Sequence, residues 1–202
     1  MTAELESTLI QRLRARDTSA LEMLMERHAG RLYRVAFGIT RDHSDADEVV
    51  QDVFLTLFNK VDSFEGRAAL GSWLYRVTTN AALIKCRGKR ARVETKLEDC
   101  LPTFLADGHR AGERSFLLAD WSQNPEEDLL SRETRLMLDR AIRALPEHYR
   151  AVLILRDVEE LPNEEIAEIV GETVAAVKSR LHRARMALRE MLTRSLAPAR
   201  DN

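Results

Sequence analysis

Apolar residues recur every three or four positions over most of this chain, which is the spacing of one face of an α-helix. No stretch shows the strict alternation of apolar and polar residues that indicates a strand, and no segment repeats. The pattern therefore predicts an all-α protein. The expected helices cover residues 4–16, 19–40, 45–61, 72–92, 126–155 with a break at Pro146, 162–171 and 173–191.

The last two expected helices form a helix-turn-helix over about residues 162–191. Pro162 suits the start of the shorter helix, because the first helical N–H has no partner in any case. Gly171 can take the positive φ that a sharp turn requires. The longer helix then carries one continuous apolar stripe. The stripe comprises Val174, Val177, Leu181, Ala184, Leu188 and Met191.

The opposite face of the longer helix is basic and includes the small residues Ala175 and Ala176. Small side chains let a helix approach DNA closely, hydroxyl, imidazole and guanidinium groups bond base edges, and flanking cations suit phosphates. This face fits a helix placed in the major groove, and the alternative is a helical hairpin whose charges meet only water. The candidate contacts to upstream DNA are Thr173, Lys178, Ser179, Arg180, His182, Arg183 and Arg185.

The formal net charge of −2 conceals a segregation of charge along the sequence. Cations gather at residues 85–96 and 178–194, and acidic residues gather at 42–52 and 126–139. Two basic surfaces and at least one acidic surface predict more than one macromolecular partner.

The chain lacks the signatures of several other classes. Cys86 and Cys100 do not suggest a disulfide scaffold, and with His109 they form only an irregularly spaced metal set, so we expect no metal and no cofactor. No apolar run is long enough to span a bilayer, residues 1–14 are not a signal peptide, and the common enzyme motifs are absent. We expect a cytoplasmic protein, monomeric when free, with no catalytic residue.

The helix expected at residues 45–61 presents an acidic face with one leucine in it. Leu55 lies among carboxylates and amides, and a polar rim around an apolar contact is typical of a partner interface. Single exposed leucines are also common on ordinary surfaces, so both interpretations stay open. The candidate partner contacts are Asp45, Asp47, Glu48, Gln51, Asp52 and Leu55.

The helix expected at residues 72–92 combines aromatic, hydroxyl and amide side chains with a basic end. We expect Leu74, Val77, Ala81 and Ile84 to face the core and Tyr75 to lie on the other side. Apolar groups stack on unpaired bases, an amide reads a base edge and cations follow the backbone, which suits melted DNA. The alternative is that the aromatic rings only pack between helices. The candidate contacts are Phe64 of the preceding loop, Ser72, Trp73, Arg76, Thr79, Asn80, Leu83 and Arg87.

The helical period fades between about residues 97 and 124, where Pro102, Gly108 and Gly112 interrupt a segment too long for an ordinary connection. We therefore expect two small helical domains, residues 1–96 and 125–202, joined by a flexible linker over residues 97–124. Apolar residues in the linker fit either a path along a partner or a segment folded back on its own domains.

Three sequence motifs follow one another along the chain. They are DADEVVQDVF at residues 45–54, FEGRAALGSWLYRVTTNAA at 64–82 and ALPEHYRAVLILRDVEELPNEEIAEIVGETVAAVKSRLHRARMALRE at 144–190. In this order they resemble the core-polymerase-binding helix, the promoter-melting segment and the C-terminal domain of the extracytoplasmic-function (ECF) sigma factors, a branch of the sigma-70 family. The chain departs from the family pattern at Leu70, Ser72, Ile84 and Lys85.

The resemblance implies a dissociable subunit of bacterial RNA polymerase. Its sigma region 2-like domain would dock the face around Leu55 on the clamp helices of the largest polymerase subunit and open the minus-ten element, with Asn80 and the loop at residues 64–72 holding a flipped base. Its region 4-like domain would read the minus-thirty-five element, and the linker would run toward the RNA exit path. An anti-sigma factor is a further expected partner, and the family needs no catalytic residue.

Three other interpretations compete with this one. A conventional helix-turn-helix regulator would act without core polymerase, with an effector pocket and palindromic half-sites. A protein-binding helical module would make no base contacts. A nucleic-acid enzyme is disfavoured, because no carboxylates or other ligands lie at metal-binding spacing.

Overall fold

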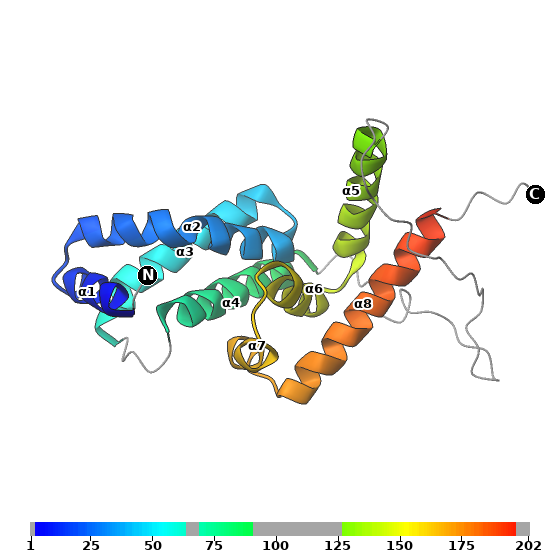
Figure 1. Cartoon of the computed structure of the whole chain (residues 1–202). Helices are drawn as coiled ribbons and strands as arrows, with labels where there is room; N and C mark the ends of the chain where they lie inside the picture. The colour runs from blue at the N-terminus through cyan, green and yellow to red at the C-terminus, as the bar shows by residue number, and fades with distance from the viewer. Residues whose placement is uncertain (1–2, 64–68, 91–126, 197–202) are drawn as a thin grey trace, which may run out of the picture.

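The computed structural model describes residues 3–63, 69–90 and 127–196, and every regular element within these ranges is helical (Figure 1). The all-α prediction is confirmed. The expected linker, residues 97–124, and Phe64 lie outside the described residues. The elements are α1 (Ala3–Arg14), α2 (Thr18–Thr40), α3 (His43–Lys60), η1 (Val61–Ser63), α4 (Leu70–Arg90), α5 (Glu127–Ala144), α6 (Glu147–Leu153), η3 (Ile154–Val158), α7 (Asn163–Val170) and α8 (Val174–Leu196).

Two aspartates begin the helices that carry the N-terminal interfaces. The Asp17 carboxylate accepts the Ser19 backbone N–H at 3.0 Å before α2, and the Asp42 carboxylate accepts the Asp45 N–H at 3.1 Å before α3. Both bonds satisfy a donor that the first helical turn leaves without an intrahelical partner. The helix of the predicted promoter-melting segment begins earlier than expected, at Leu70, which is buried.

Helices α1 to α4 form the N-terminal half of the molecule (Figure 1). Helix α2 packs against α1, α3 and α4, and α3 packs against α4, so the core of this half lies between α2, α3 and α4. Its fully buried members recur at helical spacing and include Leu24, Leu32, Val35, Ile39, Val49, Val53, Leu57 and Leu74.

Helices α5 to α8 form the C-terminal half, in which α8 packs against α5, α6 and α7. The sequence did not predict η3, where α6 continues as a single π-helical turn over Ile154–Val158. From within this turn the Arg156 guanidinium donates to the Leu161 carbonyl at 2.7 Å, which holds the segment that leads into α7.

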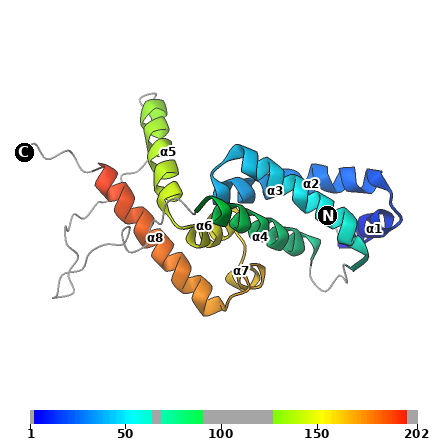
Figure 2. The same cartoon turned by 180° about the vertical axis from the view of Figure 1, so that it is seen from behind.

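The two halves pack directly on each other. Helices α6 and α7 lie against α4, and α6 and η3 also contact α2, as the two opposite views show (Figures 1 and 2). One continuous cluster of buried apolar side chains contains residues of both halves. The separate domains expected from the sequence therefore share a core in this structure.

Candidate nucleic-acid and partner interfaces

The turn between α7 and α8 has the backbone geometry expected of a helix-turn-helix. Gly171 ends α7 with φ 69° and ψ 36°, a left-handed conformation that glycine adopts without a Cβ clash. The N–H groups of Gly171 and Glu172 both donate to the Ala167 carbonyl. Thr173 precedes α8, and its hydroxyl accepts the Ala176 N–H at 3.1 Å, so Thr173 caps the helix whose start was expected there.

Helix α8 separates its two faces as the periodicity predicts. Val177, Leu181 and Ala184 of the apolar stripe are buried. The opposite face is open to solvent over the described part of the chain. Its exposed members are Ala175, Lys178, Ser179, His182, Arg183, Arg185 and Arg189.

Two arginines expected to contact upstream DNA form ion pairs within the protein. Arg180 donates to the Glu172 carboxylate at 3.1 Å. Arg185 donates from Nε and Nη2 to the two carboxylate oxygens of Asp157, and the Nε bond measures 3.1 Å. This hydrogen-bonded carboxylate raises the pKa of Arg185. A DNA phosphate would compete with a carboxylate for each of these guanidinium groups.

The acidic face predicted on α3 is exposed, with one exception. Asp47, Glu48, Gln51 and Asp52 lie on the surface, and Leu55 among them is 59% exposed. Asp45 is buried, so its assignment to this face was wrong. It precedes the buried Val49 by four residues, and positions four apart lie on the same side of a helix.

The acidic face of α3 is tied to α4. The Lys85 ammonium pairs with the Glu48 carboxylate, and this hydrogen bond raises the pKa of Lys85. A residue of the candidate partner surface therefore contacts a residue of the candidate DNA-contacting helix.

Helix α4 departs furthest from the sequence prediction. Tyr75, Thr79 and Leu83, expected on the outer side, are buried, whereas Ile84, expected in the core, is 65% exposed. The reason is that α4 is covered from two directions, by α2 and α3 on one side and by α6 and α7 on the other. Thr79 and Leu83 cannot contact DNA in this arrangement, and the Thr79 hydroxyl has no hydrogen-bond partner among the described residues.

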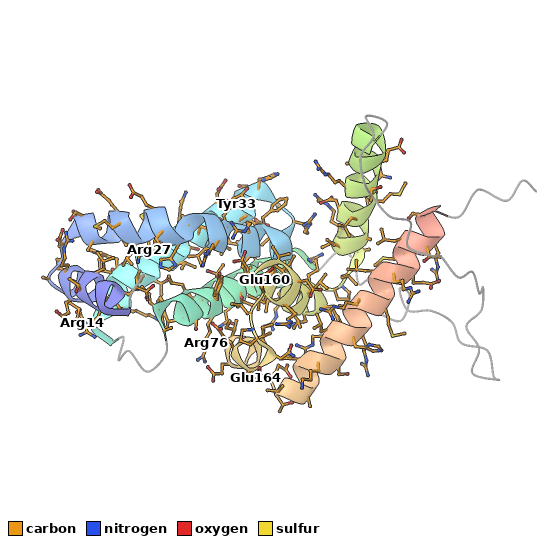
Figure 3. All side chains as sticks on the ribbon, viewed as in Figure 1. Arg14, Arg27, Tyr33, Arg76, Glu160 and Glu164 are labelled. Atoms are coloured by element: carbon orange, nitrogen blue, oxygen red, sulfur yellow. The ribbon has the colours of Figure 1, made fainter. Side chains whose placement is uncertain are left out.

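An exposed strip remains along α4. Arg76, Asn80, Ile84 and Arg87 are exposed and follow one another at steps of four, four and three residues, which places them on one side of the helix. In Figure 3 the Arg76 side chain lies at the edge of α4 on the side of α7. The strip combines two cations, an amide and an apolar group.

The first residues of α4 contact α7. The Ser72 hydroxyl donates to the Glu165 carboxylate at 2.6 Å, and Trp73 is half-buried against the core. Both residues were expected to face DNA, but in this structure they take part in the contact between the two halves.

A second contact between the two halves, also at α4, is made by a buried carboxylate. Glu159, whose side chain is 3% exposed, accepts a hydrogen bond from the Tyr75 hydroxyl at 2.7 Å and one from Arg34 Nε at 3.0 Å. Burial raises the pKa of Tyr75 to about 12, and the hydrogen bond and charge of Glu159 act in the same direction. Sequence reasoning missed Glu159 and Arg34, because no local pattern relates residues so far apart.

The described residues give no sign of a metal site or a membrane helix. No three His, Cys, Asp or Glu side chains cluster in the described ranges in a way that could hold a metal ion. No described helix is both long and apolar enough to cross a membrane. Burial raises the pKa of the Cys86 thiol, which is half-buried near Arg150, while Cys100 and His109 lie outside the described residues.

Two protein-family models match the chain. Residues 24–92 match the family described as Sigma-70 region 2, and residues 135–188 match Sigma-70, region 4. The first match covers most of α2 together with α3 and α4, and the second runs from within α5 to within α8.

Individual relatives agree over nearly the full length. The chain is 33% identical to the ECF RNA polymerase sigma-E factor of Escherichia coli (strain K12), over 91% of this chain and 92% of the relative. It is 28% identical to the ECF RNA polymerase sigma factor SigW of Bacillus subtilis (strain 168), over 91% of this chain and 94% of the relative.

Two solved structures share the fold. One is CnrH in complex with the cytosolic domain of CnrY, with a TM-score of 0.61, 22% identity and coverage of 93% of this chain and 96% of the other. The other is the sigma factor RpoE in complex with the anti-sigma factor NepR from Bartonella quintana, with a TM-score of 0.57, 23% identity and coverage of 85% and 96%.

Proposed function

The chain belongs to the extracytoplasmic-function sigma factors of the sigma-70 family, and from this membership we propose which of its surfaces bind core polymerase and which contact promoter DNA. As an alternative sigma factor, the chain binds core RNA polymerase, recognises promoter elements and promotes open-complex formation. A regulator that acts without core polymerase has no support in the family to which the chain belongs.

The exposed face of α3 docks on the clamp helices of the largest polymerase subunit. Leu55 supplies an apolar contact, and the surrounding Asp47, Glu48, Gln51 and Asp52 supply a polar rim. A large exposed apolar residue surrounded by polar residues is typical of a protein–protein interface. The burial of Asp45 removes it from this set.

The exposed strip of α4 contacts the minus-ten element. Asn80 can read the edge of an unpaired base, and Ile84 can pack against a base face. Arg76 and Arg87 lie on the same side, where their charges suit phosphates. Binding unpaired bases offsets the few kcal/mol that unstacking and unpairing cost, so melting requires capture rather than catalysis.

Helix α8 reads the minus-thirty-five element in the major groove. The observation that carries this assignment is the Gly171 turn, because it places a helix with a buried apolar stripe so that its opposite, basic face is open to solvent. Ser179, His182 and Arg183 are the candidates for base contacts, and Lys178 is the candidate for a phosphate contact.

The remaining functional assignments follow from the same membership. The chain contributes no catalytic group, because the polymerase performs nucleotide addition, and it acts in the cytoplasm, where promoter DNA lies. An anti-sigma factor restrains it. The solved structure of the sigma factor RpoE supports this assignment, because RpoE shares the fold of this chain and is bound there to the anti-sigma factor NepR.

In vitro transcription tests the proposed function. Purified core polymerase is incubated with and without the full-length chain on fragments of DNA from upstream of its own coding region. We expect discrete run-off transcripts only when the chain is present, and their 5′ ends define the promoter. DNA binding without core polymerase and without a new transcript would instead identify a conventional helix-turn-helix regulator.

A further inference from the structure

Two ion pairs flank the exposed face of α8. The Arg185 guanidinium donates from Nε and Nη2 to the two carboxylate oxygens of Asp157, and the Arg180 guanidinium pairs with the Glu172 carboxylate at 3.1 Å. Neither carboxylate belongs to α8, because Asp157 lies in η3 and Glu172 lies in the turn before the helix. Two segments that precede α8 in the chain therefore each supply an acid to an arginine of this helix.

The two arginines lie on opposite sides of the face that the proposed function assigns to base contacts. At about 100° per residue, Arg180 lies roughly 60° from Arg183 in one direction around the helix, and Arg185 lies roughly 160° from it in the other. Ser179 and His182 fall within the larger arc. The ion pairs therefore bracket the candidate base-reading side chains without involving them.

The cations inside this bracket are not paired in the same way. Lys178 and Arg183 are exposed, and no carboxylate of the described residues forms an ion pair with either. An unpaired cation can bind a phosphate directly, whereas an arginine held by a carboxylate must first give up that partner. The two carboxylates therefore lower the affinity of the flanking arginines for phosphate and leave the other cations available.

The Asp157–Arg185 pair has the stronger geometry of the two. Contact through Nε and Nη2 matches the fork of the carboxylate, and bidentate pairs of this kind are among the strong hydrogen bonds of proteins. Asp157 lies in the single π-helical turn of the described chain, and such turns are frequent at functional sites. The side chains are 53% and 35% exposed for Arg185 and Asp157, so water screens the pair and a phosphate can still displace the carboxylate.

DNA without the upstream element depends on the flanking arginines more than the promoter does. Binding without base contacts rests almost entirely on the neutralisation of phosphates, so its affinity follows the number of available cations. On the upstream element, base contacts fix α8 in one position, and the carboxylates can keep their arginines. The ion pairs therefore weaken the wrong complex more than the right one, which is a recognised route to specificity.

We propose that Asp157 and Glu172 are specificity-determining residues of promoter recognition, which hold Arg185 and Arg180 in ion pairs and so lower the affinity of α8 for DNA that lacks the upstream element. The inference rests on the proposed role of α8 in reading that element. Each carboxylate acts through its arginine, and neither needs to touch DNA.

Neutral variants of the full-length chain test this role. Asp157→Asn and Glu172→Gln each remove one carboxylate charge and keep the shape of the side chain. Glu168→Gln is their control, because it removes the same charge from an exposed residue of α7 that forms no ion pair among the described residues. Arg185→Ala, alone and combined with Asp157→Asn, shows whether Asp157 acts through Arg185.

Fluorescence anisotropy at several salt concentrations measures the affinity of each variant for two labelled duplexes. One carries the minus-thirty-five region of the promoter mapped by run-off transcription, and the other carries an unrelated sequence of the same length. We expect Asp157→Asn and Glu172→Gln to bind the unrelated duplex roughly three- to fivefold more tightly and the promoter duplex less than about twofold more tightly. The slope of log K against log salt on the unrelated duplex should steepen by about 1. Glu168→Gln should match the wild type on both duplexes.

Three results would overturn the proposal. An equal gain on both duplexes, or the same gain from Glu168→Gln, identifies a general effect of net charge. A gain from Asp157→Asn that persists in the Arg185→Ala background shows that Asp157 does not act through this arginine. If both test variants bind the unrelated duplex no better than the wild type does, the ion pairs do not limit binding to DNA.

Failure of this proposal and failure of the proposed function are distinguishable. A wild-type chain that gives no run-off transcript contradicts the proposed function, whereas affinities and salt slopes on the unrelated duplex need no promoter and still show whether the carboxylates withhold the arginines from phosphate. Circular dichroism confirms that each variant is folded. Because the two test variants break different ion pairs, the failure of one to fold leaves the other decisive.

Discussion

The hydroxyl of Tyr75 on α4 donates a 2.7 Å hydrogen bond to the carboxylate of Glu159, which directly follows η3. The bond joins the two halves of the chain across 84 residues of sequence, and both of its side chains are buried. A tyrosine next to a buried carboxylate resists ionisation, since the phenolate would be both desolvated and repelled. The contact therefore depends on pH in the alkaline range.

Tyr75→Phe should reduce stability near neutral pH and remove part of the alkaline loss of stability. The pKa of Tyr75 is raised from 10.0 to about 12, so between these values the folded state holds a proton that the unfolded state releases, and stability falls as pH rises. Thermal melting from pH 8 to pH 12 should show the wild type above Tyr75→Phe up to about pH 10, with a gap that then narrows. A constant gap to pH 12 would contradict the assignment.

Leu55→Asp should abolish tight binding to core polymerase while leaving the fold intact. Leu55 is 59% exposed, so the substitution should change the free energy of unfolding by no more than about 0.5 kcal/mol. A central apolar contact in a protein interface contributes about 2 kcal/mol or more, which predicts at least a tenfold weaker Kd. The measurement is titration of the labelled chain with core enzyme. Met25→Asp is the control, because Met25 is an exposed apolar residue of α2; affinity unchanged by Leu55→Asp would remove the interface.

Arg183→Ala and Lys178→Ala should weaken DNA binding in different ways. Loss of a base contact by Arg183 should cost about 1–3 kcal/mol on the upstream element and little on unrelated DNA. Loss of a phosphate contact by Lys178 should weaken binding uniformly and lower the slope of log K against log salt by about 1. Anisotropy titrations of the holoenzyme on matched and scrambled duplexes, at several salt concentrations, separate the two effects. Equal losses on both duplexes from both variants would refute base reading by Arg183.

The contrast between α8 and α4 explains how much of the candidate sites the sequence could predict. Helix α8 buries part of the predicted stripe, so a single periodicity identified Val177, Leu181 and Ala184 as core and left Arg183 on the open face, although Ala187 and Glu190 outside the stripe are also buried. Helix α4 is covered from two directions, and one periodicity cannot describe two buried faces. Ile84 was consequently placed on the wrong side.

The contact between the halves could not be predicted from local pattern for a related reason. Arg34 and Glu159 are 125 residues apart, and each is an ordinary charged residue within its own stretch of sequence. Gly38 lies within α2 like any tolerated helical glycine, and only the position of Ile154 shows why a side chain is excluded there. The helices, by contrast, were predictable because caps such as Asp17 and Asp42 act on their immediate neighbours.

His28 should make the protein less stable in mild acid. Burial lowers its pKa below the ordinary 6.5, and its Nε2 has no hydrogen-bond partner among the described residues. The unfolded chain therefore binds a proton more readily, and stability is lost as pH falls through and below about 6.5. Thermal melting between pH 8 and pH 5 should show a smaller decrease for His28→Leu than for the wild type. His182→Leu, at an exposed site on α8, should decrease as the wild type does; equal decreases for all three proteins would exclude His28 as the cause.

Ile84→Ala should impair promoter opening more than promoter binding. Ile84 is 65% exposed between Asn80 and Arg87, and an apolar side chain at a DNA-facing position can insert next to a base step and stabilise its unstacked state. We expect about fivefold less open complex by permanganate footprinting of the holoenzyme on duplex promoter, and unchanged affinity for the upstream element. Met25→Ala, which shortens an exposed apolar residue of α2, is the control and should open the promoter as the wild type does.

A template with a pre-melted minus-ten region distinguishes two roles of Ile84. If this template restores open-complex formation, Ile84 acts in separating the strands, and if the defect persists, Ile84 contacts the captured strand. An Ile84→Ala variant that opens duplex promoter normally would show that this exposed isoleucine takes no part in melting.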